Sequence, residues 1–596
     1  MRQTCFSAER DNIMIKTLAS YVKEFKRVSF LTPVCMIGEV IMEMVIPMLM
    51  ASIIDEGVNQ GNLEHIYRVG VWMIAAAALG LAAGVLGGVF GARASTGFAR
   101  NLRKGMFDNI QTFSFANIDK FSVAGLVTRL TTDVTNLQMA YQMLLRMTFR
   151  APTSLIIAMV MAFSINARLA SIYLAAVVIL AAVLFFIMSR AVRYFRQVFE
   201  KYDELNASVQ ENVSGIRVVK SCVREDYENK KFSRAAENLY RMFVRAEKIV
   251  VCNAPVMQLT VYTCILLISW LGARMIVADS LTTGELMSLL TYCMNILMSL
   301  MMLSMIFVML TMSEASGERV AQVLNEKSTL ENPENPVYEV ENGSIEFRDV
   351  SFSYSETAEK PVLEHINLSI KSGETIGIIG GTGSSKSSLV NLISRLYDVT
   401  EGSVLVGGRD VRSYDMESLR NQVAVVLQKN VLFSGTILEN LRWGDENATL
   451  EECVRACQLA CADDFIEQFP DKYDTHIEQG GTNVSGGQKQ RLCIARALLK
   501  KPKILILDDS TSAVDTATDA RIRKSLAREI PDTTKLIIAQ RISSVQNADR
   551  IIVMENGRVN GFGTHEELLA GNEIYRDVYE SQMSGSGDFD ENGGEA

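Results

Sequence analysis

The chain has few of the residues that bind metal ions or build disulfide frameworks. Its 596 residues include 4 histidines and 10 scattered cysteines, several of which lie in apolar segments. Cys453, Cys457 and Cys461 recur every four residues, a spacing that places them along one face of a helix. The C-x-x-C spacing of zinc sites and a neighbouring histidine are both missing there. We therefore expect reduced, buried thiols at these positions and not a metal site.

The chain also lacks a positive net charge. The formal net charge is −9, which argues against a nucleic-acid-binding protein. The first fifteen residues are polar and contain no compact apolar core, so we expect no cleavable signal peptide. In contrast, 48% of the residues are hydrophobic, which is high for a soluble protein and indicates a membrane part joined to a soluble part. A chain of 596 residues is too long for one typical domain, and its length favours about four.

Six long apolar stretches precede residue 315. Each is near or above the ~20 residues that a helix needs to cross a bilayer. They are residues 28–53, 68–92, 147–165, 168–190, 250–276 and 283–312. The segments between the second and third stretches, and between the fourth and fifth, are too long for turns, and we expect them to be helices that extend into the cytoplasm. The pattern predicts an all-α transmembrane domain of six helices.

Basic residues indicate how the spans are oriented, because Lys and Arg concentrate on the cytoplasmic side of a membrane. The first loop, residues 55–65, has none, whereas basic residues precede the first span and follow the second and fourth. They are Lys16, Lys23, Lys26, Arg27, Arg93, Arg100, Arg103, Lys104, Arg190, Arg193, Arg196 and Lys201. Both termini and the soluble domain are therefore predicted to be cytoplasmic. Residues 16–27 combine helical apolar spacing with basic residues, which predicts a helix on the inner surface of the lipid bilayer.

Two sets of residues in the spans are candidates for contact with a small-molecule substrate. Glu39 and Glu43 share one face of the first span, where a carboxylate among lipid tails requires a polar cavity or a partner. They predict either a site for cationic substrates or groups that pair within the protein, and both interpretations stay open. Methionines in the last span recur every three, four or seven residues, which fits a pliant substrate-binding face but favours packing between helices. They are Met287, Met294, Met298, Met301, Met305, Met309 and Met312.

A glycine-rich segment after an apolar run carries the clearest chemical signal. Residues 375–379 predict a buried parallel strand, and the GGTGSSKSS segment after it predicts a turn whose backbone N–H groups bind phosphates. In such a turn Lys386 contacts the β- and γ-phosphate oxygens, and the Ser387 hydroxyl ligates Mg²⁺. Ser385 stands where the pattern G-x-x-x-x-G-K-[ST] has glycine, which indicates strain in the turn. The predicted nucleotide-binding residues of this loop are Gly380, Gly381, Thr382, Gly383, Ser384, Ser385, Lys386, Ser387 and Ser388.

A second apolar run, residues 504–507, ends at Asp508. This is the layout of a core strand that brings a carboxylate to Mg²⁺ at its C-terminal edge. The sequence VSGGQ, residues 484–488, lies between the two motifs. Together the three segments predict that the chain binds ATP and Mg²⁺.

With these motifs in this order, the chain resembles half-transporters of the ATP-binding cassette (ABC) exporter family over essentially its whole length. The resemblance implies the type I (type IV) exporter fold, in which a six-helix transmembrane domain is followed by an α/β P-loop ATPase domain. Tyr354 falls where the family stacks an aromatic ring on adenine. Gln428 falls at the Q-loop glutamine, which contacts Mg²⁺ and relays to the membrane domain, and Glu478 at the x-loop acid. Short coupling helices are implied near residues 114–121 and 223–232.

The resemblance also implies a second chain. In the family the two ATPase domains pack head to tail, so that the signature of one closes over the ATP of the other. The signature residues here are Ser485, Gly486, Gly487 and Gln488, and residues 512–515 match the D-loop.

Two positions depart from the family pattern. Asp509 stands where the family has a glutamate that polarises the attacking water, and its carboxylate is set back by roughly one C–C bond. A general base must come within about 2.6–3.2 Å of the proton that it takes. Gln540 replaces the switch histidine, and glutamine carries no charge at any pH. The resemblance is therefore to the degenerate-site subunit of heterodimeric bacterial multidrug exporters, although both changes could also be drift in a working ATPase.

The predicted organisation has five parts. They are a cytoplasmic N-terminus with an interfacial helix (1–27), the transmembrane domain (28–324), a polar linker (325–343), the ATPase domain (344–583) and a disordered acidic tail (584–596). The predicted function is ATP-dependent export of drug-like or lipid-like molecules across the bacterial cytoplasmic membrane, with a different half-transporter as partner. A homodimeric exporter with a slow ATPase, a non-transporting ABC regulator and an importer built on the exporter fold remain alternatives.

Overall fold

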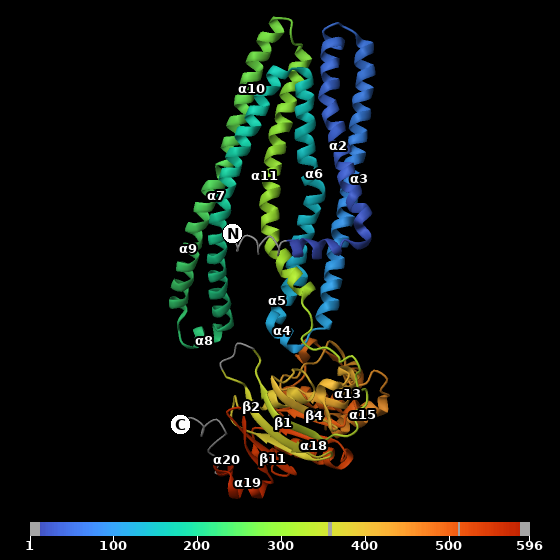
Figure 1. Ribbon diagram of the computed structural model, residues 1–596, viewed down its shortest axis with the longest axis vertical. Helices are drawn as coiled ribbons and strands as arrows, with labels where there is room; N and C mark the ends of the chain where they lie inside the picture. Colours follow the sequence, from blue (N-terminus) through green and yellow to red (C-terminus); the bar gives the residue numbers. More distant parts are fainter. Residues whose placement is uncertain (1–11, 356–359, 511–512, 584–596) are drawn as a thin grey trace. The chain divides into compact units, whose positions relative to one another are not determined.

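The computed structural model describes residues 12–355, 360–510 and 513–583, and it divides into two compact units (Figure 1). The first unit contains residues up to Thr112 together with Ser122–Glu326. The second contains Phe113–Phe121 together with the residues from Lys327 onward. Most of the predicted linker therefore belongs to the second unit, where Leu330 and Val340 are buried.

The described residues of the first unit form helices joined by short turns. These are η1 (Lys23–Phe25), α2 (Lys26–Ser52), η2 (Ile53–Val58), α3 (Leu63–Gln111), α5 (Val123–Thr128), η3 (Arg129–Asp133), α6 (Val134–Ile165), α7 (Ala167–Ser214), α8 (Ile216–Ser221), α9 (Glu225–Val251), α10 (Asn253–Val277) and α11 (Thr283–Asn325). Residues 12–20 are also helical and are followed by a turn at residues 21–22, inside the segment predicted to lie on the membrane surface.

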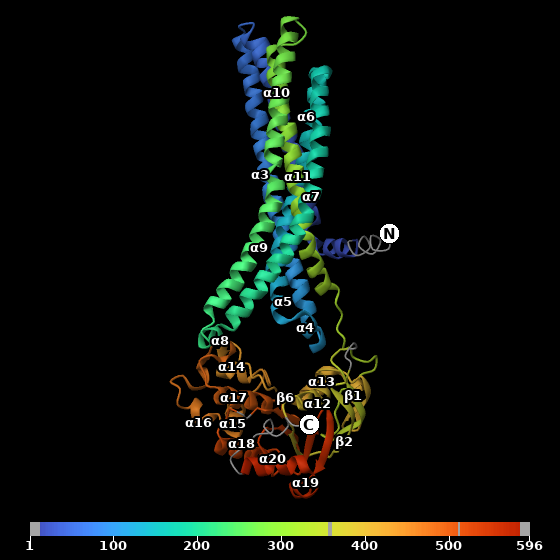
Figure 2. The same cartoon turned by 90° about the vertical axis from the view of Figure 1, so that its left-hand side faces the viewer.

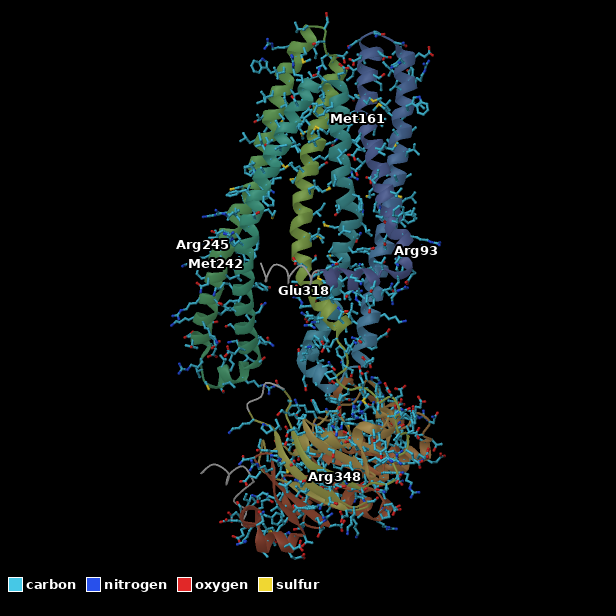
Figure 3. The ribbon with its side chains drawn as sticks, in the orientation of Figure 1. Arg93, Met161, Met242, Arg245, Glu318 and Arg348 are labelled. Carbon is cyan, nitrogen blue, oxygen red and sulfur yellow. The ribbon has the colours of Figure 1, made fainter. Side chains whose placement is uncertain are left out.

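Six helical stretches in the described part of the chain are long and apolar enough to cross a membrane, which confirms the predicted number of spans. They are Lys23–Val58, Leu63–Gln111, Val123–Ile165, Ala167–Phe195, Glu225–Val277 and Thr283–Leu303. Arg93, one of the basic residues that follow the second span, is exposed and points away from α3 (Figure 3). Arg245 on α9 points outward in the same way.

Side-chain caps mark where three of the long helices begin. Asn62 accepts the His65 N–H at the start of α3, and Asn166 accepts two backbone N–H groups at the start of α7. Thr282 and Glu285 form a reciprocal capping box at the start of α11. Such caps satisfy backbone donors that have no partner within the helix. They place the helix ends in the short loops between the spans.

The core of the helical unit contains two buried tyrosines. Tyr173 and Tyr292 are at most 1% exposed. The Tyr173 hydroxyl donates to the Leu289 carbonyl oxygen at 2.7 Å, and the Tyr292 hydroxyl donates to the Met44 carbonyl oxygen at 2.8 Å. Each tyrosine thus buries its aromatic ring while its hydroxyl makes a hydrogen bond. The two hydrogen bonds connect α7 and α2 to α11.

The long helices extend beyond the predicted spans, and one of the two coupling helices lies elsewhere than predicted. α7 and α9 run side by side toward α8 (Figures 1 and 2). The short helix at this turn is α8, so the placement near residues 223–232 was wrong. Gly215 ends α7, and α9 begins at Glu225 because acidic residues in its first turn favour a helix N-terminus. The other short helix, α4 (Phe115–Phe121), lies within the predicted segment and belongs to the second unit.

The second unit contains two main β-sheets. A four-stranded antiparallel sheet has the order β2 (Leu363–Ile370), β1 (Ile345–Phe352), β4 (Glu401–Val406) and β5 (Arg409–Asp410). A six-stranded sheet has the order β12 (Arg558–Gly563), β11 (Arg550–Glu555), β3 (Thr375–Ile379), β10 (Thr534–Ile538), β9 (Ile504–Asp508) and β6 (Val423–Val426). Its strands are parallel except for β12, which pairs with β11 in the antiparallel direction. β7 (Gly435–Thr436) and β8 (His476–Ile477) form a small pair.

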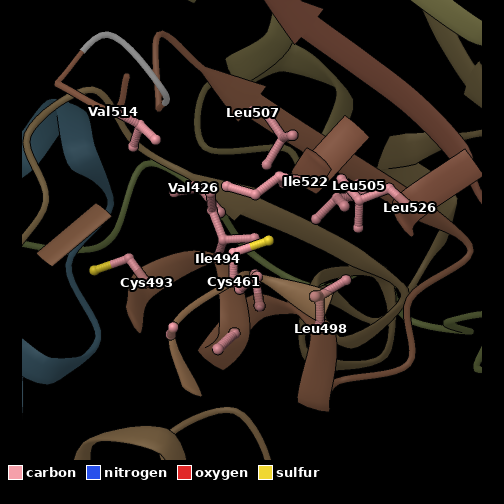
Figure 4. Close-up of a cluster of buried hydrophobic side chains, with 14 of the residues drawn as sticks. Val426, Cys461, Cys493, Ile494, Leu498, Leu505, Leu507, Val514, Ile522 and Leu526 are labelled. Carbon is pink, nitrogen blue, oxygen red and sulfur yellow. The ribbon is translucent and has the colours of Figure 1, made fainter. Parts of the chain in front are cut away.

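Helices complete this unit. They are α12 (Lys386–Ile393), η4 (Val411–Ser413), α13 (Met416–Gln422), α14 (Ile437–Leu441), α15 (Leu450–Leu459), α16 (Asp463–Ile466), η5 (Lys472–Asp474), η6 (Gln479–Gly481), α17 (Gly486–Leu499), α18 (Thr516–Glu529), η7 (Ile542–Ser544), α19 (His565–Gly571) and α20 (Glu573–Met583). Leu505 and Leu507 of β9 gather with side chains of α17 and α18 in a buried cluster (Figure 4). Cys453, Cys457 and Cys461 are at most 5% exposed and belong to this core. Both predicted parts of the fold, a domain of long apolar helices and an α/β domain, are confirmed.

Candidate nucleotide-binding site

Three neighbouring parallel strands bring the predicted site residues to one edge of the six-stranded sheet. β10 lies between β3 and β9. The phosphate loop follows β3, Gln540 follows β10, and Asp508 is the last residue of β9, directly before Asp509. Since the carboxyl ends of parallel strands meet at the same edge of a sheet, these segments lie close together.

The phosphate loop is closely packed at its base. A Cβ at Gly380 would lie 2.3 Å from the Met554 carbonyl oxygen, so a larger residue does not fit there. Lys386 Nζ donates to the carbonyl oxygens of Gly380 and Gly381 at 2.7 and 2.8 Å. The ammonium group therefore lies against the loop that is predicted to hold the phosphates.

Ser385 adopts the backbone conformation that usually favours glycine. Its φ is 70° and its ψ is 24°, in the left-handed region. For a residue with a Cβ this conformation costs roughly 1–2 kcal/mol. The strain expected from the sequence therefore has a defined location, immediately before the first residue of α12.

The side-chain oxygens of Ser387 and Asp508 lie together at the edge of the sheet. The Ser387 hydroxyl is hydrogen-bonded to the Asp508 carboxylate, which is 5% exposed. Burial raises the pKa of Asp508 above its ordinary value, and the Ser387 hydrogen bond and the Lys386 charge oppose that shift. Mg²⁺ prefers carboxylate, hydroxyl and amide oxygens. The Ser387 and Asp508 oxygens therefore fit Mg²⁺, and Gln428 Nε2 lies 3.5 Å from Oδ2 of the adjacent Asp509.

Asp509 lies between two glutamine side chains. Gln540 Nε2 donates to Asp509 Oδ2 at 3.2 Å, and Gln428 Nε2 makes a longer contact of 3.5 Å with the same oxygen. Asp509 has φ of 47°, a left-handed conformation that Asp tolerates better than most residues. The structure thus brings the Q-loop and switch positions to the same oxygen of Asp509.

The signature residues form the N-terminus of a separate helix, α17. Ser485 is its N-cap: the Ser485 Oγ accepts the Gln488 N–H, and the Gln488 Oε1 accepts the Ser485 N–H at 2.9 Å. A Cβ at Gly487 would lie 2.8 Å from the Ala513 carbonyl oxygen, and the Ala513 N–H donates to the Gln490 side chain at 3.1 Å. The described D-loop residues therefore pack on the signature helix. Thr511 and Ser512 lie outside the described residues.

Tyr354 belongs to an aromatic cluster that reaches α4. The Tyr354 hydroxyl lies 2.8 Å from the Ser388 hydroxyl, and its ring meets that of Tyr397 edge to face, with centroids 5.0 Å apart. The Tyr397 hydroxyl donates to Asp119 Oδ2 at 2.7 Å, and Phe115 of α4 also contacts the Tyr397 ring. Burial, together with the Asp119 carboxylate, raises the pKa of Tyr397, so the phenol keeps the proton that it donates. Sequence reasoning missed Tyr397 and Asp119, since no local motif links them.

In the helical unit, Glu39 and Glu43 pair with a basic residue of another span. Arg150 of α6 contacts both carboxylates, and its Nη2 lies 2.9 Å from Glu43 Oε2. This arrangement supports the interpretation that the two acids pair within the protein. The sequence pattern gave no sign of Arg150, because it lies in a different span.

The sequence favoured packing of the last-span methionines between helices, but five of them are exposed in this chain. Met287, Met294, Met298, Met301 and Met305 are 41–64% exposed. Met309 is half-buried, and the side chain of Met312 lies outside the described residues. A flexible apolar surface is therefore open on α11 when the chain is considered alone.

Comparison with known proteins agrees with this geometry. The family described as "ABC transporter transmembrane region" matches residues 29–308, and the family described as "ABC transporter" matches residues 363–512. The ABC transporter ATP-binding protein YfiB of Bacillus subtilis is 37% identical over 568 residues, which cover 95% of this chain and 98% of that protein. The chain belongs to the ABC transporter family.

Other relatives of this ABC transporter chain include proteins with a more specific name. An ATP-dependent lipid A-core flippase of Desulfotalea psychrophila is 35% identical over 495 residues, which cover 82% of this chain and 85% of that protein. A solved structure of a bacterial Atm1-family ABC exporter with ATP bound has a TM-score of 0.80 and 24% identity, and the match covers 94% of this chain and 99% of that one. This likeness confirms the exporter fold predicted from the sequence.

Proposed function

We propose that this chain is the degenerate-site half of a heterodimeric ABC exporter in a bacterial cytoplasmic membrane. It would bind ATP firmly at its own phosphate loop, hydrolyse it slowly there, and help a different half-transporter to move drug-like or lipid-like molecules outward. Family membership, six candidate spans and the exporter fold support ATP-driven transport. The contacts of Asp509 support the proposal that this site hydrolyses ATP slowly.

Asp509 is poorly suited to act as a general base. Its side chain is one methylene shorter than glutamate, and Oδ2 accepts from the amide of Gln540 at 3.2 Å. A base must come within about 2.6–3.2 Å of the proton that it takes, directly or through one water. A carboxylate that is set back and held by a neighbouring amide does not meet this requirement well. Gln540 adds no positive charge where the family places histidine.

The parts that bind the nucleotide are retained. Lys386, the Ser387–Asp508 pair and the ring of Tyr354 supply a phosphate contact, the Mg²⁺ ligands and an adenine platform. Mg²⁺, when bound, would neutralise charge on the phosphate oxygens. Ser387 and Asp508 would hold it at the edge of the sheet, and Gln428 would connect it to the Q-loop. These features support tight binding without fast hydrolysis.

The signature is equipped to act on a second chain. Ser485 to Gln488 begin α17, a helix of 14 residues whose N-terminal dipole attracts anions. Packing of Gly487 on Ala513 leaves no room for a larger residue there. Such a surface suits the γ-phosphate of ATP held by a partner chain. We infer that the partner carries glutamate and histidine at the two positions that are altered here.

The test compares the chain alone with the chain purified in complex with its partner half-transporter, both in lipid nanodiscs. We expect the ATPase rate of the chain alone to be on the order of 10²-fold or more below that of the complex, since a lost transition-state donor commonly costs that much. Lys386→Ala in this chain serves as a control for contaminating ATPase.

The two-chain proposal has a clear contrary result. If the chain alone hydrolyses ATP as fast as the complex, the homodimeric exporter is the correct description. The same preparations also test tight binding, because labelled ATP should dissociate from the site with Lys386 more slowly than the complex turns over.

A further inference from the structure

The last described helix contacts the switch loop of the nucleotide site. α20 carries Gln582 in its final turn, 42 residues beyond Gln540. Gln582 Nε2 donates to the Gln540 carbonyl oxygen at 3.0 Å, and Gln582 Oε1 accepts the Ile542 N–H at 2.9 Å. One side-chain amide therefore bonds to the backbone on both sides of Arg541.

These bonds hold the short segment that joins β10 to η7. Gln540 lies after the end of β10, and Ile542 is the first residue of η7. The contact to the Ile542 N–H is part-buried, so this donor needs a partner, which Gln582 Oε1 supplies, whereas the contact to the Gln540 carbonyl oxygen is exposed. The other side of η7 is fixed by α18, where Arg523 Nη1 donates to the Ser544 carbonyl oxygen at 2.9 Å. The switch loop is thus held between α18 and α20.

α20 itself is firmly anchored in the ATPase core. Tyr575 and Val578 are at most 3% exposed, and the Tyr575 hydroxyl lies 2.6 Å from His565 Nδ1 of α19. The buried face of α20 fixes the helix, and its last turn carries Gln582 to the switch loop (Figure 2 shows α20 at the base of this unit). A displacement of α20 would therefore be transmitted to the backbone of Gln540.

We propose that Gln582 is a positioning residue for ATP hydrolysis. It sets the switch-loop backbone so that the side chain of residue 540 faces Asp509, where Gln540 Nε2 donates to Asp509 Oδ2. Because Gln582 bonds only to backbone groups in these contacts, it can hold the loop in the same way with glutamine or histidine at position 540. The helix α20 thereby helps to position the residues that take part in ATP hydrolysis.

The experiment uses Gln582→Met, which keeps the length of the side chain but removes both hydrogen bonds. It is made in the native chain and in a chain carrying Asp509→Glu and Gln540→His, and both are purified with the partner half-transporter. Single-turnover ATP hydrolysis at this chain's site and the dissociation constant for Mg²⁺-ATP are measured separately. In the chain with Asp509→Glu and Gln540→His we expect hydrolysis to fall about ten-fold, as for the loss of one to two hydrogen bonds. In the native chain, where Gln540 holds the Asp509 carboxylate, we expect a smaller change in the rate. The dissociation constant should change less than about two-fold, because the phosphate loop and Tyr354 are untouched.

Two further variants separate positioning from general stability. Gln582→Glu still accepts the Ile542 N–H but cannot donate to the Gln540 carbonyl oxygen, so we expect an equal or larger loss of hydrolysis. Asp577→Asn changes an exposed residue of the same helix and should leave hydrolysis as it is. In the chain with Asp509→Glu and Gln540→His, unchanged hydrolysis in Gln582→Met, or a loss of nucleotide affinity equal to the loss of rate, would overturn the proposal.

The outcome is independent of the degenerate-site proposal. If the chain alone proves to be a fast ATPase, the degenerate-site proposal fails. The effect of Gln582→Met on ATP hydrolysis is then measured in the chain alone. If Gln582→Met has no effect in either background, the role of Gln582 fails while the division of labour between two chains still holds.

Discussion

Ser385 shows how a single residue can depart from a motif at a definite energetic cost. The phosphate loop requires a left-handed backbone at this position, with φ of 70°, and the chain supplies a residue with a Cβ. The motif predicted the loop and its ligands, because the spacing of glycine, lysine and serine is local. The position of Asp509 relative to Gln428 and Gln540 could not be predicted in the same way, since the three residues come from different segments of the sheet edge.

The strain at Ser385 should be measurable. Ser385→Gly removes the Cβ, and we expect a net stabilisation of up to about 1 kcal/mol once the greater freedom of glycine in the unfolded chain is counted. For a domain of this size that raises the Tm of the ATPase unfolding transition by about 2–4 °C in calorimetry. Ser385→Ala keeps the Cβ and should leave the Tm nearly unchanged. A lower Tm for Ser385→Gly than for Ser385→Ala would contradict the assignment of strain.

At the scale of elements, the spans were predictable and the short connecting helices only partly so. Hydrophobic length is a property of contiguous sequence, which is why six spans are found as predicted. The chain reversal after α7 depends instead on where helices stop, and there Gly215 and the acidic start of α9 placed the short helix at Ile216–Ser221. The contacts of Tyr397 and Gln582 join residues far apart in sequence, so no periodicity indicates them.

α4 offers a test of one such contact. It has 7 residues, too few to be a stable helix by itself, so its order depends on neighbours such as Tyr397. Tyr397→Phe keeps the ring contacts but removes the hydrogen bond to Asp119, and we expect amide hydrogen exchange in α4 to rise about ten-fold. Mass spectrometry of the intact chain measures this, with α8 as an internal control of similar length. Unchanged exchange in α4, or an equal rise in α8, would show that the hydrogen bond does not order the helix.

For the complete transporter, the decisive question is whether Asp509 and Gln540 slow ATP hydrolysis as we propose. Asp509→Glu restores the reach of the carboxylate, and Gln540→His restores a side chain that can carry charge. We expect the double variant of the chain alone to hydrolyse ATP on the order of 10²-fold faster than the native chain. Each single variant should gain less, because residues that act as a unit are not additive. Asp509→Glu also places a longer side chain at φ of 47°, which lowers its separate gain.

The same variant reports on how two copies cooperate. Head-to-tail packing requires Ser485 of one copy at the phosphate loop of the other, so adding Ser485→Ala to the double variant should abolish most of the gain. ATP binding should persist in this triple variant, because Lys386, Ser387 and Asp508 are intact. If the double variant stays as slow as the native chain, some feature other than Asp509 and Gln540 limits hydrolysis. If the gain survives Ser485→Ala, the hydrolysis does not depend on a signature supplied by a second chain.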